Sequence, residues 1–474
     1  MSGQTTAATT ATVRAPDTEA DVAVVGAGPA GLNAALALAR GGLRVALIEE
    51  SSELGGQYYK RRKAPMAAAF GDFRPEGTAL VRAVRAAGVN CLTQTLVWGA
   101  DDDGRTLFTA DVRTSAAGRV RARATIVATG AFERTEPFPG WVLPGVVTAG
   151  FALHLATMDR VPVGRRVVVA GTGPFLLPVA CALLEVGARV EALLELNHPY
   201  RLRPDSLGAV RPARLVEAAG YLLTLARHSV RIEQGMRVLA AHGNERVRSV
   251  EVGPAAGGVG AVRQLEVDAL CVGFGFRPST ELPRMLGCLT RTSAPGGDEL
   301  PVLDHDGATS IDGLYVAGEA AGIAGVHAAG VRGELAAHAV LRRLGQGASP
   351  RRVSALRRRA CSLDRFAALN QRLFPPPGDT AVSLADGTQV CRCEGITAGE
   401  IRRAAASGWN DLHAMKGATR AGMGPCQGRE CSHIVAALTG EMSGRPCDSA
   451  SFSARIPLRP VPLRIAMAAA AEEL

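Results

Sequence analysis

Four cysteines near the end of the 474-residue chain have the spacing of a metal centre. Cys391 and Cys393 are separated by one residue in VCRCEG, and Cys426 and Cys431 by four residues in GPCQGREC. Side chains two residues apart in an extended segment point to the same side, so the first pair can ligate one iron atom and the second pair another. This pattern favours a [2Fe–2S] cluster.

Glycines and arginines beside these cysteines suit such a cluster. Glycine leaves its backbone N–H free to hydrogen-bond a sulfur atom, and arginine can offset the negative charge of four thiolates. The residues in question are Gly422, Gly424, Gly428, Arg392, Arg420 and Arg429.

Four thiolates could also hold a structural zinc ion, which would make this segment a docking module for a partner. Paired zinc ligands usually have two to four residues between them, whereas Cys391 and Cys393 have one. We therefore expect iron, and metal analysis separates the two interpretations. The other six cysteines show no ligand spacing and are expected to be incidental thiols: Cys91, Cys181, Cys271, Cys288, Cys361 and Cys447.

A glycine-rich loop near the start of the chain has the sequence of a dinucleotide site. In ADVAVVGAGPAG, an apolar strand ends at Gly26, where a tight turn begins. Gly28 lets the backbone approach a pyrophosphate, and Gly31 lets the following helix pack closely on the strand. The helix N-terminus then offers free N–H groups and a partial positive charge to the phosphates. Glu49, at the end of the second strand, is placed to accept hydrogen bonds from a ribose diol.

A second segment, RRVVVAGTGPFLLPVACALLEVGARVEALLE, repeats this pattern with departures. Gly171 and Gly173 remain, but Leu176 replaces the third glycine and should push the helix away from the strand. Pro178 also removes an amide near the start of the helix.

The acidic residue of the second segment falls one position late. Residue 194, which corresponds to Glu49 by counting, is leucine, and the acid is Glu195. On a strand, an offset of one residue points a side chain to the opposite face. The segment therefore predicts weak or no NAD(P) binding, with a structural relic or a different nucleotide in its place.

The order of strands, glycine turns and helices predicts an α/β fold with two Rossmann-like dinucleotide-binding domains, one inserted in the other, and a small helical C-terminal domain. Thr397 and Glu400 form a capping box for one helix of that last domain, and Asn410 or Asp411 can cap the next. The predicted boundaries are a disordered lead-in at 1–17, a first domain at 18–155 and 265–345, an insert at 156–264, a linker containing FPPPGD at 346–384, a cysteine domain at 385–440 and a tail at 441–474.

Further motifs resemble the two-dinucleotide-domain flavoproteins of the thioredoxin reductase and ferredoxin reductase type over residues 20–345. The motifs are GAGPAG, GGQ at 55–57, VATGAFER and GLYVAGEAAG. This resemblance implies FAD in the first domain. It places Gly56 and Gln57 along the flavin, Thr129 and Gly130 near the adenosine, and Gly318 and Glu319 on the ribityl chain and pyrophosphate. The redox-active CxxC of those reductases is missing, so electrons must leave the flavin by another route.

Residues 390–437 resemble the [2Fe–2S] domain of bacterioferritin-associated ferredoxin, in which the four matching cysteines are the ligands. With the degenerate insert and the closing ARIPLRPVPL, the chain resembles the α (A) subunits of heteromeric FAD-dependent amino-acid and opine dehydrogenases. The α (A) subunits of octopine and nopaline oxidase and the corresponding HcnB-type subunit of hydrogen cyanide synthase belong to that group.

This resemblance implies that a separate flavoprotein β subunit, similar to D-amino-acid oxidase, oxidises a C–N bond. The present chain then relays the electrons to an acceptor, and a small third subunit is a further expected partner. No catalytic base or substrate clamp can be singled out in the sequence. The alternative is a self-sufficient NAD(P)H:acceptor oxidoreductase that passes electrons from FAD to its own [2Fe–2S] cluster.

The net charge of +9 is spread along the chain. Only RRVSALRRR, at 351–359, is a basic cluster, and we expect it to be a solvated helix face and not a nucleic-acid site. The uncharged run from Val22 to Ala39 is broken by glycines and a proline, so it predicts a strand and a helix instead of a membrane span. We expect a cytoplasmic protein that at most contacts the inner face of the membrane.

Overall fold

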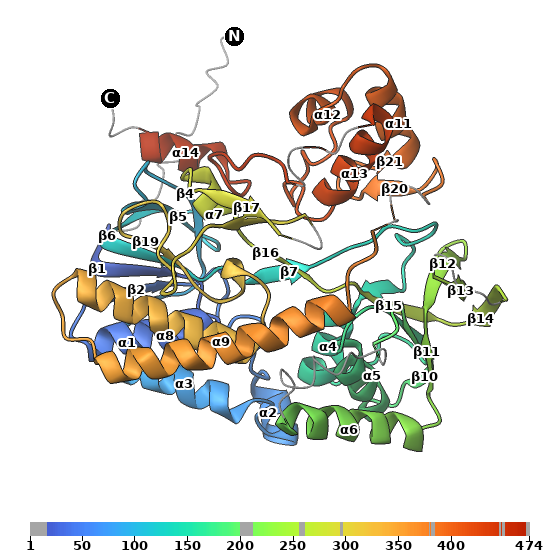
Figure 1. The fold of residues 1–474 in the computed structure, drawn as a ribbon, viewed down its shortest axis with the longest axis horizontal. Coiled ribbons are helices and arrows are strands. Elements are labelled where there is room, and N and C mark those ends of the chain that lie inside the picture. Colours follow the sequence, from blue (N-terminus) through green and yellow to red (C-terminus); the bar gives the residue numbers. More distant parts are fainter. Residues whose placement is uncertain are drawn as a thin grey trace, which may run out of the picture.

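A largely parallel sheet forms the centre of the first domain (Figure 1). The computed structural model describes residues 17–199, 212–255, 261–293, 297–378, 380, 384–444, 447 and 451–470. The sheet has the strand order β3-β2-β1-β6-β5-β4, with β19 also paired to β6. Its strands are β1 (Thr18–Val25), β2 (Val45–Ile48), β3 (Asn90–Leu92), β4 (Thr95–Ala100), β5 (Thr106–Asp111), β6 (Ala117–Val127) and β19 (Leu314–Val316). Because β19 follows the insert in the chain, the first domain is discontinuous, as the sequence predicts.

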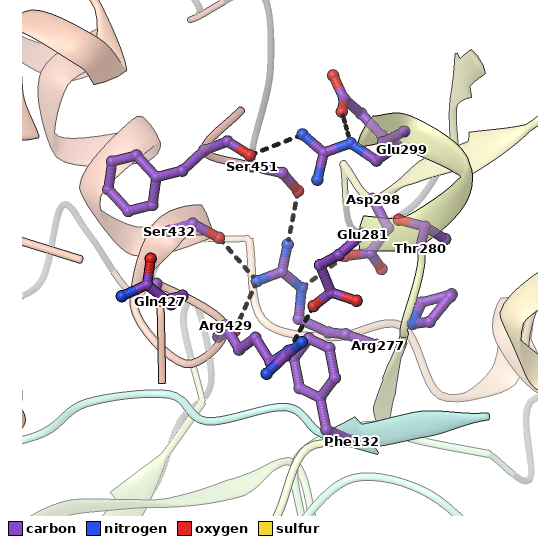
Figure 2. Close-up of a pocket in the computed structure, with 14 residues that line it drawn as sticks. Phe132, Arg277, Thr280, Glu281, Asp298, Glu299, Gln427, Arg429, Ser432 and Ser451 are labelled. Carbon is purple, nitrogen blue, oxygen red and sulfur yellow. Dashed lines mark hydrogen bonds and ion pairs between the residues drawn. The ribbon is translucent and has the colours of Figure 1, made fainter. Parts of the chain in front are cut away.

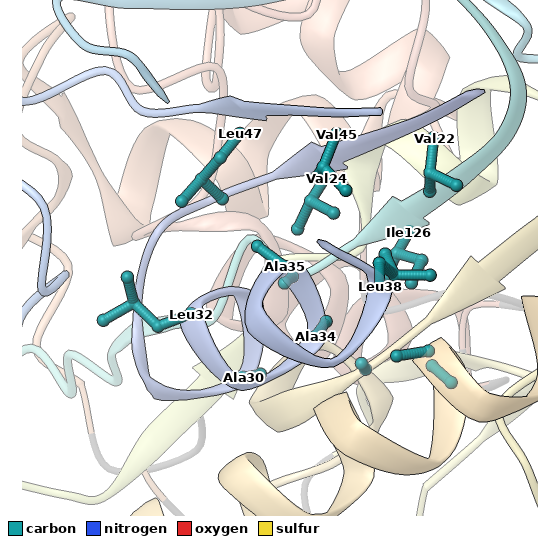
Figure 3. Close-up of a cluster of buried hydrophobic side chains, with 14 of the residues drawn as sticks. Val22, Val24, Ala30, Leu32, Ala34, Ala35, Leu38, Val45, Leu47 and Ile126 are labelled. Atoms are coloured by element: carbon teal, nitrogen blue, oxygen red, sulfur yellow. The ribbon is translucent and has the colours of Figure 1, made fainter. Parts of the chain in front are cut away.

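Helices cover one face of this sheet (Figure 1). They are α1 (Pro29–Arg40), α3 (Pro75–Ala86) and α8 (Val326–Arg343). Apolar side chains of α1, including Leu32 and Leu38, pack against Val22, Val24 and Ile126 of the sheet (Figure 3). This burial holds the N-terminus of α1 at the carboxyl end of β1, where the glycine loop lies.

The insert has its own five-stranded parallel sheet, in the order β11-β10-β9-β15-β8. Its strands are β8 (Val146–Thr148), β9 (Arg166–Gly171), β10 (Arg189–Glu195), β11 (Arg231–Gln234) and β15 (Ala269–Gly273), and its helices include α4 (Ala149–His154), α5 (Leu176–Glu185) and α6 (Pro212–Arg227). An antiparallel sheet of β12 (Met236–His242), β13 (Ser249–Pro254) and β14 (Arg263–Glu266) lies beside it.

The insert is larger than predicted. β8 and β15 lie outside the predicted span of 156–264, yet both pair within the insert's sheet. The two domains are joined by the antiparallel strands β7 (Ala131–Glu133) and β16 (Phe276–Pro278). The crossover strands β7 and β16 therefore mark the boundary, because chain pairing and not composition decides where each sheet ends.

The segment at 346–384 is not a simple linker. Most of it forms α9 (Pro350–Leu373), which Ser349 caps and which packs along α8. Val353 and Leu356 are buried in that contact, whereas the arginines of the basic cluster are exposed, which confirms the solvated helix face. α9 thus belongs to the first domain, and the chain leaves it at the prolines after Leu373.

The C-terminal domain is small and mainly helical, as predicted. It contains β20 (Gln389–Cys391), β21 (Ile396–Thr397), α11 (Ala398–Ala406), α12 (Leu412–Thr419) and α13 (Ser432–Ser443). The capping box of Thr397 and Glu400 is present, and Asp411 caps α12. The tail then returns to the first domain, where Ile465 of α14 (Leu463–Ala470) is buried beside Trp98.

Among the residues that the structure describes, no helix is both long and apolar enough to cross a membrane.

Gly31→Ala should destabilise the first domain. The added Cβ would lie 1.8 Å from the backbone oxygen of Gly26, so α1 or the loop must shift. We expect the free energy of unfolding to fall by about 1–3 kcal/mol, as measured by urea unfolding followed by circular dichroism. As a control, Gly220→Ala in α6 meets open space and should be neutral or slightly stabilising. Equal unfolding of Gly31→Ala and the wild type would contradict the close packing of α1.

Candidate cofactor sites and the interface between them

The first glycine loop leaves open space at the N-terminus of α1. A Cβ on Gly28 would find its nearest neighbour, the Cα of Gly56, at 4.0 Å. A Cβ on Gly56 would instead lie 2.7 Å from the Cα of Gly28, so the two backbones face each other closely. α1 begins directly after Gly28, whose carbonyl accepts the first helical hydrogen bond from Leu32 at 2.9 Å. Free amides and open space at one helix start suit a pyrophosphate.

Glu49 is held at the base of this loop. It is 8% exposed, and its carboxylate accepts hydrogen bonds from the amides of Ala27 and Ser51, each at 2.9 Å. A carboxylate has about four acceptor positions, so the two remaining can take a ribose diol.

The other residues predicted to bind FAD divide into two groups. Gly318 lies against α1, since a Cβ there would be 2.7 Å from the Cβ of Ala30. Glu319 accepts a hydrogen bond from the amide of Gly325 at 2.8 Å, and Gln57 is exposed beside Gly56. In the second group, Thr129 and Gly130 bond to Ser279: the Thr129 hydroxyl donates to the Ser279 carbonyl, and the Ser279 amide donates to the carbonyl of Gly130. The latter pair therefore ties the loop after β6 to the chain after β16.

The acid of the second glycine loop is not displaced, which corrects the sequence prediction. Glu195 pairs with Gly171 in the ladder, and Leu194 takes the position that Ile48 has in β2. A β-bulge between Val190 and Ala192 absorbs the extra residue, so Glu195 occupies the place of Glu49. Counting along the chain cannot detect such a bulge.

Glu195 is occupied by its own loop. Its carboxylate accepts hydrogen bonds from the Thr172 hydroxyl and from the amides of Gly173 and Asn197, at 2.8–2.9 Å. The amide nitrogen of Asn197 also donates to the Thr172 hydroxyl and to the carbonyl of Pro375. This part of the second loop is thus closed by contacts within the chain.

The helix of the second loop starts late. α5 begins at Leu176, three residues after Gly173, and the preceding turn has the tighter i to i−3 hydrogen bonds from Leu176 and Leu177. Pro178 has no N–H to donate to the carbonyl of Pro174, so the first α-helical bond is missing. The buried Leu176 side chain occupies the position where the first loop has glycine. Fewer helix-start amides therefore face a ligand than in the first loop.

The four cysteines predicted as ligands converge from two segments. Hydrogen bonds between thiols pair Cys391 with Cys431 and Cys393 with Cys426. The sequence predicts that the two cysteines of each segment pair, and the structure instead pairs them across the segments. The glycine prediction is borne out by amide contacts to sulfur: Gly422 donates to Cys391 at 3.5 Å, and Gly428 donates to Cys426.

The thiols influence one another strongly. The Cys431 thiol donates to Cys391 and, with the Gly422 amide, lowers the pKa of Cys391 to about 6. The same bond, with burial, raises the pKa of Cys431 well above its ordinary value. Among the described residues no three Cys, His, Asp or Glu side chains are grouped closely enough to hold a single metal ion. Two contacting cysteine pairs therefore suit the two irons of a [2Fe–2S] cluster better than one zinc ion.

The arginines near the cysteines have partners of their own. Arg392 pairs with Glu430 at 3.9 Å and Arg420 with Glu394 at 2.9 Å, while Arg429 reaches across to Glu281 of the first domain. They are therefore not available simply to offset four thiolates, and the prediction of that role is revised.

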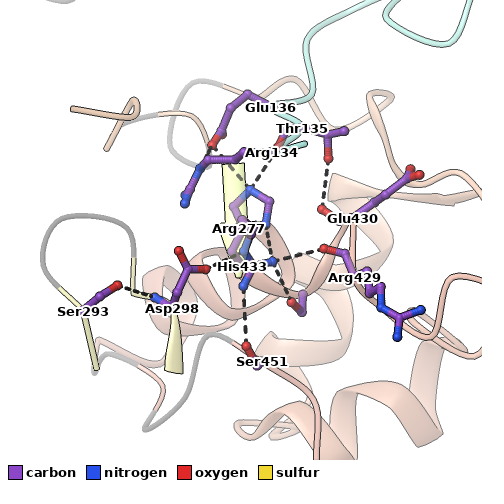
Figure 4. Close-up of polar contacts among 11 residues, drawn as sticks. Arg134, Thr135, Glu136, Arg277, Ser293, Asp298, Arg429, Glu430, His433 and Ser451 are labelled. Atoms are coloured by element: carbon purple, nitrogen blue, oxygen red, sulfur yellow. Dashed lines mark hydrogen bonds and ion pairs between the residues drawn. The ribbon is translucent and has the colours of Figure 1, made fainter. Parts of the chain in front are cut away.

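Buried charges join the cysteine domain to the crossover strands (Figure 4). Arg277 of β16 is 3% exposed. Its Nε donates to Asp298 at 2.6 Å, and its Nη1 donates to the carbonyl of Arg429, to Ser432 and to Nδ1 of His433 at 3.1–3.2 Å. No sequence motif marks these residues, because they come from distant parts of the chain.

The contacts of His433 fix its protonation. Burial lowers the pKa of His433 to about 4, so the imidazole is neutral near pH 7. Arginine can only donate, so Nδ1 accepts from Arg277 and Nε2 carries the proton. Nε2 lies 3.0 Å from the carbonyl of Thr135 and 3.4 Å from the carboxylate of Glu136, which also accepts from Arg134. The residues after β7 are thereby fastened to α13.

A narrow cavity of ≈ 40 Å³ lies between these groups, lined by Arg277, Glu281, Gln427, Arg429 and Ser451 among others (Figure 2). Ligand pockets are commonly about 300–1,000 Å³, so this space is too small for a nucleotide or an opine. The interface is a packed joint and not a substrate site.

Gly28→Ala should keep the fold and deplete FAD. The polypeptide has room for the added methyl group, which would occupy the space expected for the pyrophosphate. We expect most of the bound FAD to be lost, as measured by the ratio of flavin to protein absorbance, with an unchanged unfolding midpoint. Normal FAD content would mean that the nucleotide lies elsewhere.

Cys393→Ser should abolish the cluster and keep the FAD, because the two sites lie in different domains. Anaerobically purified wild-type protein should contain about two iron atoms per chain, and the variant essentially none. Cys361→Ser, at an exposed cysteine of α9, is the matched control and should keep its iron. Stoichiometric zinc without iron in the wild type would refute the cluster assignment.

Comparisons with known proteins agree with this architecture. Residues 20–340 match the pyridine nucleotide-disulphide oxidoreductase family, and residues 389–439 match the BFD-like [2Fe-2S] binding domain. The α (A) subunit of opine oxidase from Agrobacterium tumefaciens (strain Ach5) is 34% identical, over 94% of this chain and 90% of its own length. Hydrogen cyanide synthase subunit HcnB of Pseudomonas protegens (strain CHA0) is 31% identical, over 93% of this chain and 96% of its own length.

A solved structure also shares nearly the whole fold. L-proline dehydrogenase from P. horikoshii has a TM-score of 0.69 and 25% identity, covering 95% of this chain and 80% of its own. The two glycine loops, the docked cysteine domain and these full-length matches lead to one conclusion. The chain belongs to the pyridine nucleotide-disulphide oxidoreductase family and, within it, to the group of the opine oxidase α (A) subunits and HcnB, as an FAD- and [2Fe–2S]-containing oxidoreductase subunit.

Proposed function

We propose that this electron-transfer subunit receives electrons from a partner flavoprotein that oxidises a C–N bond of an amino acid or opine. The relatives are named as subunits of opine oxidase and hydrogen cyanide synthase, and their names suggest the class of substrate. The proposed partner resembles D-amino-acid oxidase, and a small third subunit is a further candidate. The final recipient of the electrons is a separate acceptor.

One observation carries the relay proposal. The cysteine loop is fastened by buried charged contacts to the crossover strands of the FAD-binding part of the chain. When bound, FAD exchanges electrons in pairs or singly and a [2Fe–2S] cluster carries one at a time. Holding both sites in one unit suits the conversion of a two-electron oxidation into single-electron steps.

Specific residues are proposed to hold each group. For FAD they are Gly26, Gly28, Gly31, Glu49, Gly56, Gln57, Thr129, Gly130, Gly318 and Glu319. For the cluster they are Cys391, Cys393, Cys426 and Cys431. No residue of this chain is assigned to substrate oxidation, and the small size of the interface cavity supports placing that reaction on the partner.

One observation favours the alternative, a self-sufficient NAD(P)H:acceptor oxidoreductase. Glu195 lies where an acid would bind the ribose of NADH, in a loop that retains Gly171 and Gly173. The late start of α5 and the internal contacts of Glu195 weigh against it, because both remove groups that a dinucleotide needs. We therefore keep the relay as the proposed function.

Stopped-flow spectroscopy of the anaerobic isolated chain separates the two functions. Excess NADH or NADPH should fail to bleach the flavin at a useful rate, because the second loop offers few free amides. An amino acid or opine alone should fail as well. Addition of the partner flavoprotein should give substrate-dependent reduction of both flavin and cluster. Fast bleaching by NAD(P)H without a partner would sink the relay proposal.

A further inference from the structure

We infer that Arg277 and Arg429 are positioning residues that fix the cluster relative to the FAD site for electron transfer between them. The two side chains cross the same interface in opposite directions, and we call this pair the arginine clasp (Figure 2). The inference rests on the proposed function only in that electrons pass between the two groups.

Arg277 reaches from the first domain into the cysteine loop. Asp298 neutralises its charge on the near side, at 2.6 Å. On the far side it donates to the carbonyl of Arg429 and the hydroxyl of Ser432, which is the residue next to Cys431. Neither side alone supplies acceptors for all of its donors.

Arg429 reaches in the opposite direction. It lies between the ligands Cys426 and Cys431, and its Nε donates to the largely buried carboxylate of Glu281. Burial alone would raise the pKa of Glu281, but the charge and hydrogen bond of Arg429 outweigh it and hold this pKa below its ordinary value. The pair is therefore ionised and closed.

The clasp ends close to residues of the FAD site. Glu281 also accepts a hydrogen bond from the hydroxyl of Ser279 at 2.9 Å. Ser279 in turn bonds to Thr129 and Gly130, two residues proposed to contact the FAD. A short series of direct contacts thus leads from the cysteine loop to the FAD site.

Stability alone does not explain the clasp. Replacing a buried ion pair with apolar side chains is often neutral or stabilising, because burying charge is costly. The planar guanidinium instead provides several donors in a fixed geometry, which lysine cannot reproduce. Since electron transfer slows steeply with distance, a fixed geometry at this joint has a direct functional value.

Arg277→Met in the holoprotein tests the inference. We expect FAD and iron to be retained, while the rate of flavin-to-cluster electron transfer after flash photoreduction falls about tenfold or more, as for other losses of reactant positioning. The cluster should also quench FAD emission less, giving a longer emission lifetime. Neither readout needs the partner or a substrate, so failure here and failure of the proposed function are distinguishable.

Two further variants sharpen the test. Arg277→Lys can still neutralise Asp298 but cannot also bridge to the loop, so it should recover only part of the rate and the quenching. Arg263→Met is the matched control, because it removes an arginine paired to both oxygens of Glu233 in the insert, and it should change neither.

Several results would overturn the inference. A wild-type rate and emission lifetime in Arg277→Met would show that the arginine does not position the cluster. Full recovery in Arg277→Lys would reduce its role to neutralising Asp298. If Arg277→Met fails to fold or to keep its cluster, Glu281→Gln decides: slower transfer with both groups bound supports the clasp, and an unchanged rate overturns it.

Discussion

A buried guanidinium keeps its positive charge, so Arg277 must find acceptors on every side of its plane. It obtains them from two domains, with Asp298 on one side and Ser432, His433 and the carbonyl of Arg429 on the other. This requirement fixes the orientation of the cysteine domain on the crossover strands. The position of the cysteines relative to the first glycine loop follows from it.

The same interface gives the two dinucleotide domains different roles. The first loop begins its helix at once and leaves open space beside Gly28 and Gly56. The second loop has the same topology, but Glu195, Thr172 and Asn197 bond to one another there. One loop is thus prepared for a cofactor, while the other mainly supports the architecture. The family relationship to the opine oxidase α (A) subunits places this division within a multisubunit oxidoreductase.

Features encoded within a single short segment could be predicted from the sequence. The Gly26 loop, the four cysteines and the capping box of Thr397 are examples, because the spacing of neighbouring residues determines their geometry. Features that depend on pairing between segments could not. The bulge in β10 moves Glu195 back into register, and the contact of Arg277 with His433 joins positions 156 residues apart. The predicted linker failed for a similar reason, because α9 is defined by its packing on α8.

The central claim is that one chain holds FAD and a [2Fe–2S] cluster as a single electron-carrying unit. The most direct measurement is an anaerobic reductive titration of the isolated holoprotein, with flavin and cluster followed at separate wavelengths. The account predicts that about three electrons are taken up per chain, two by FAD and one by the cluster. Uptake of only two electrons, with no change at the cluster wavelengths, would contradict it.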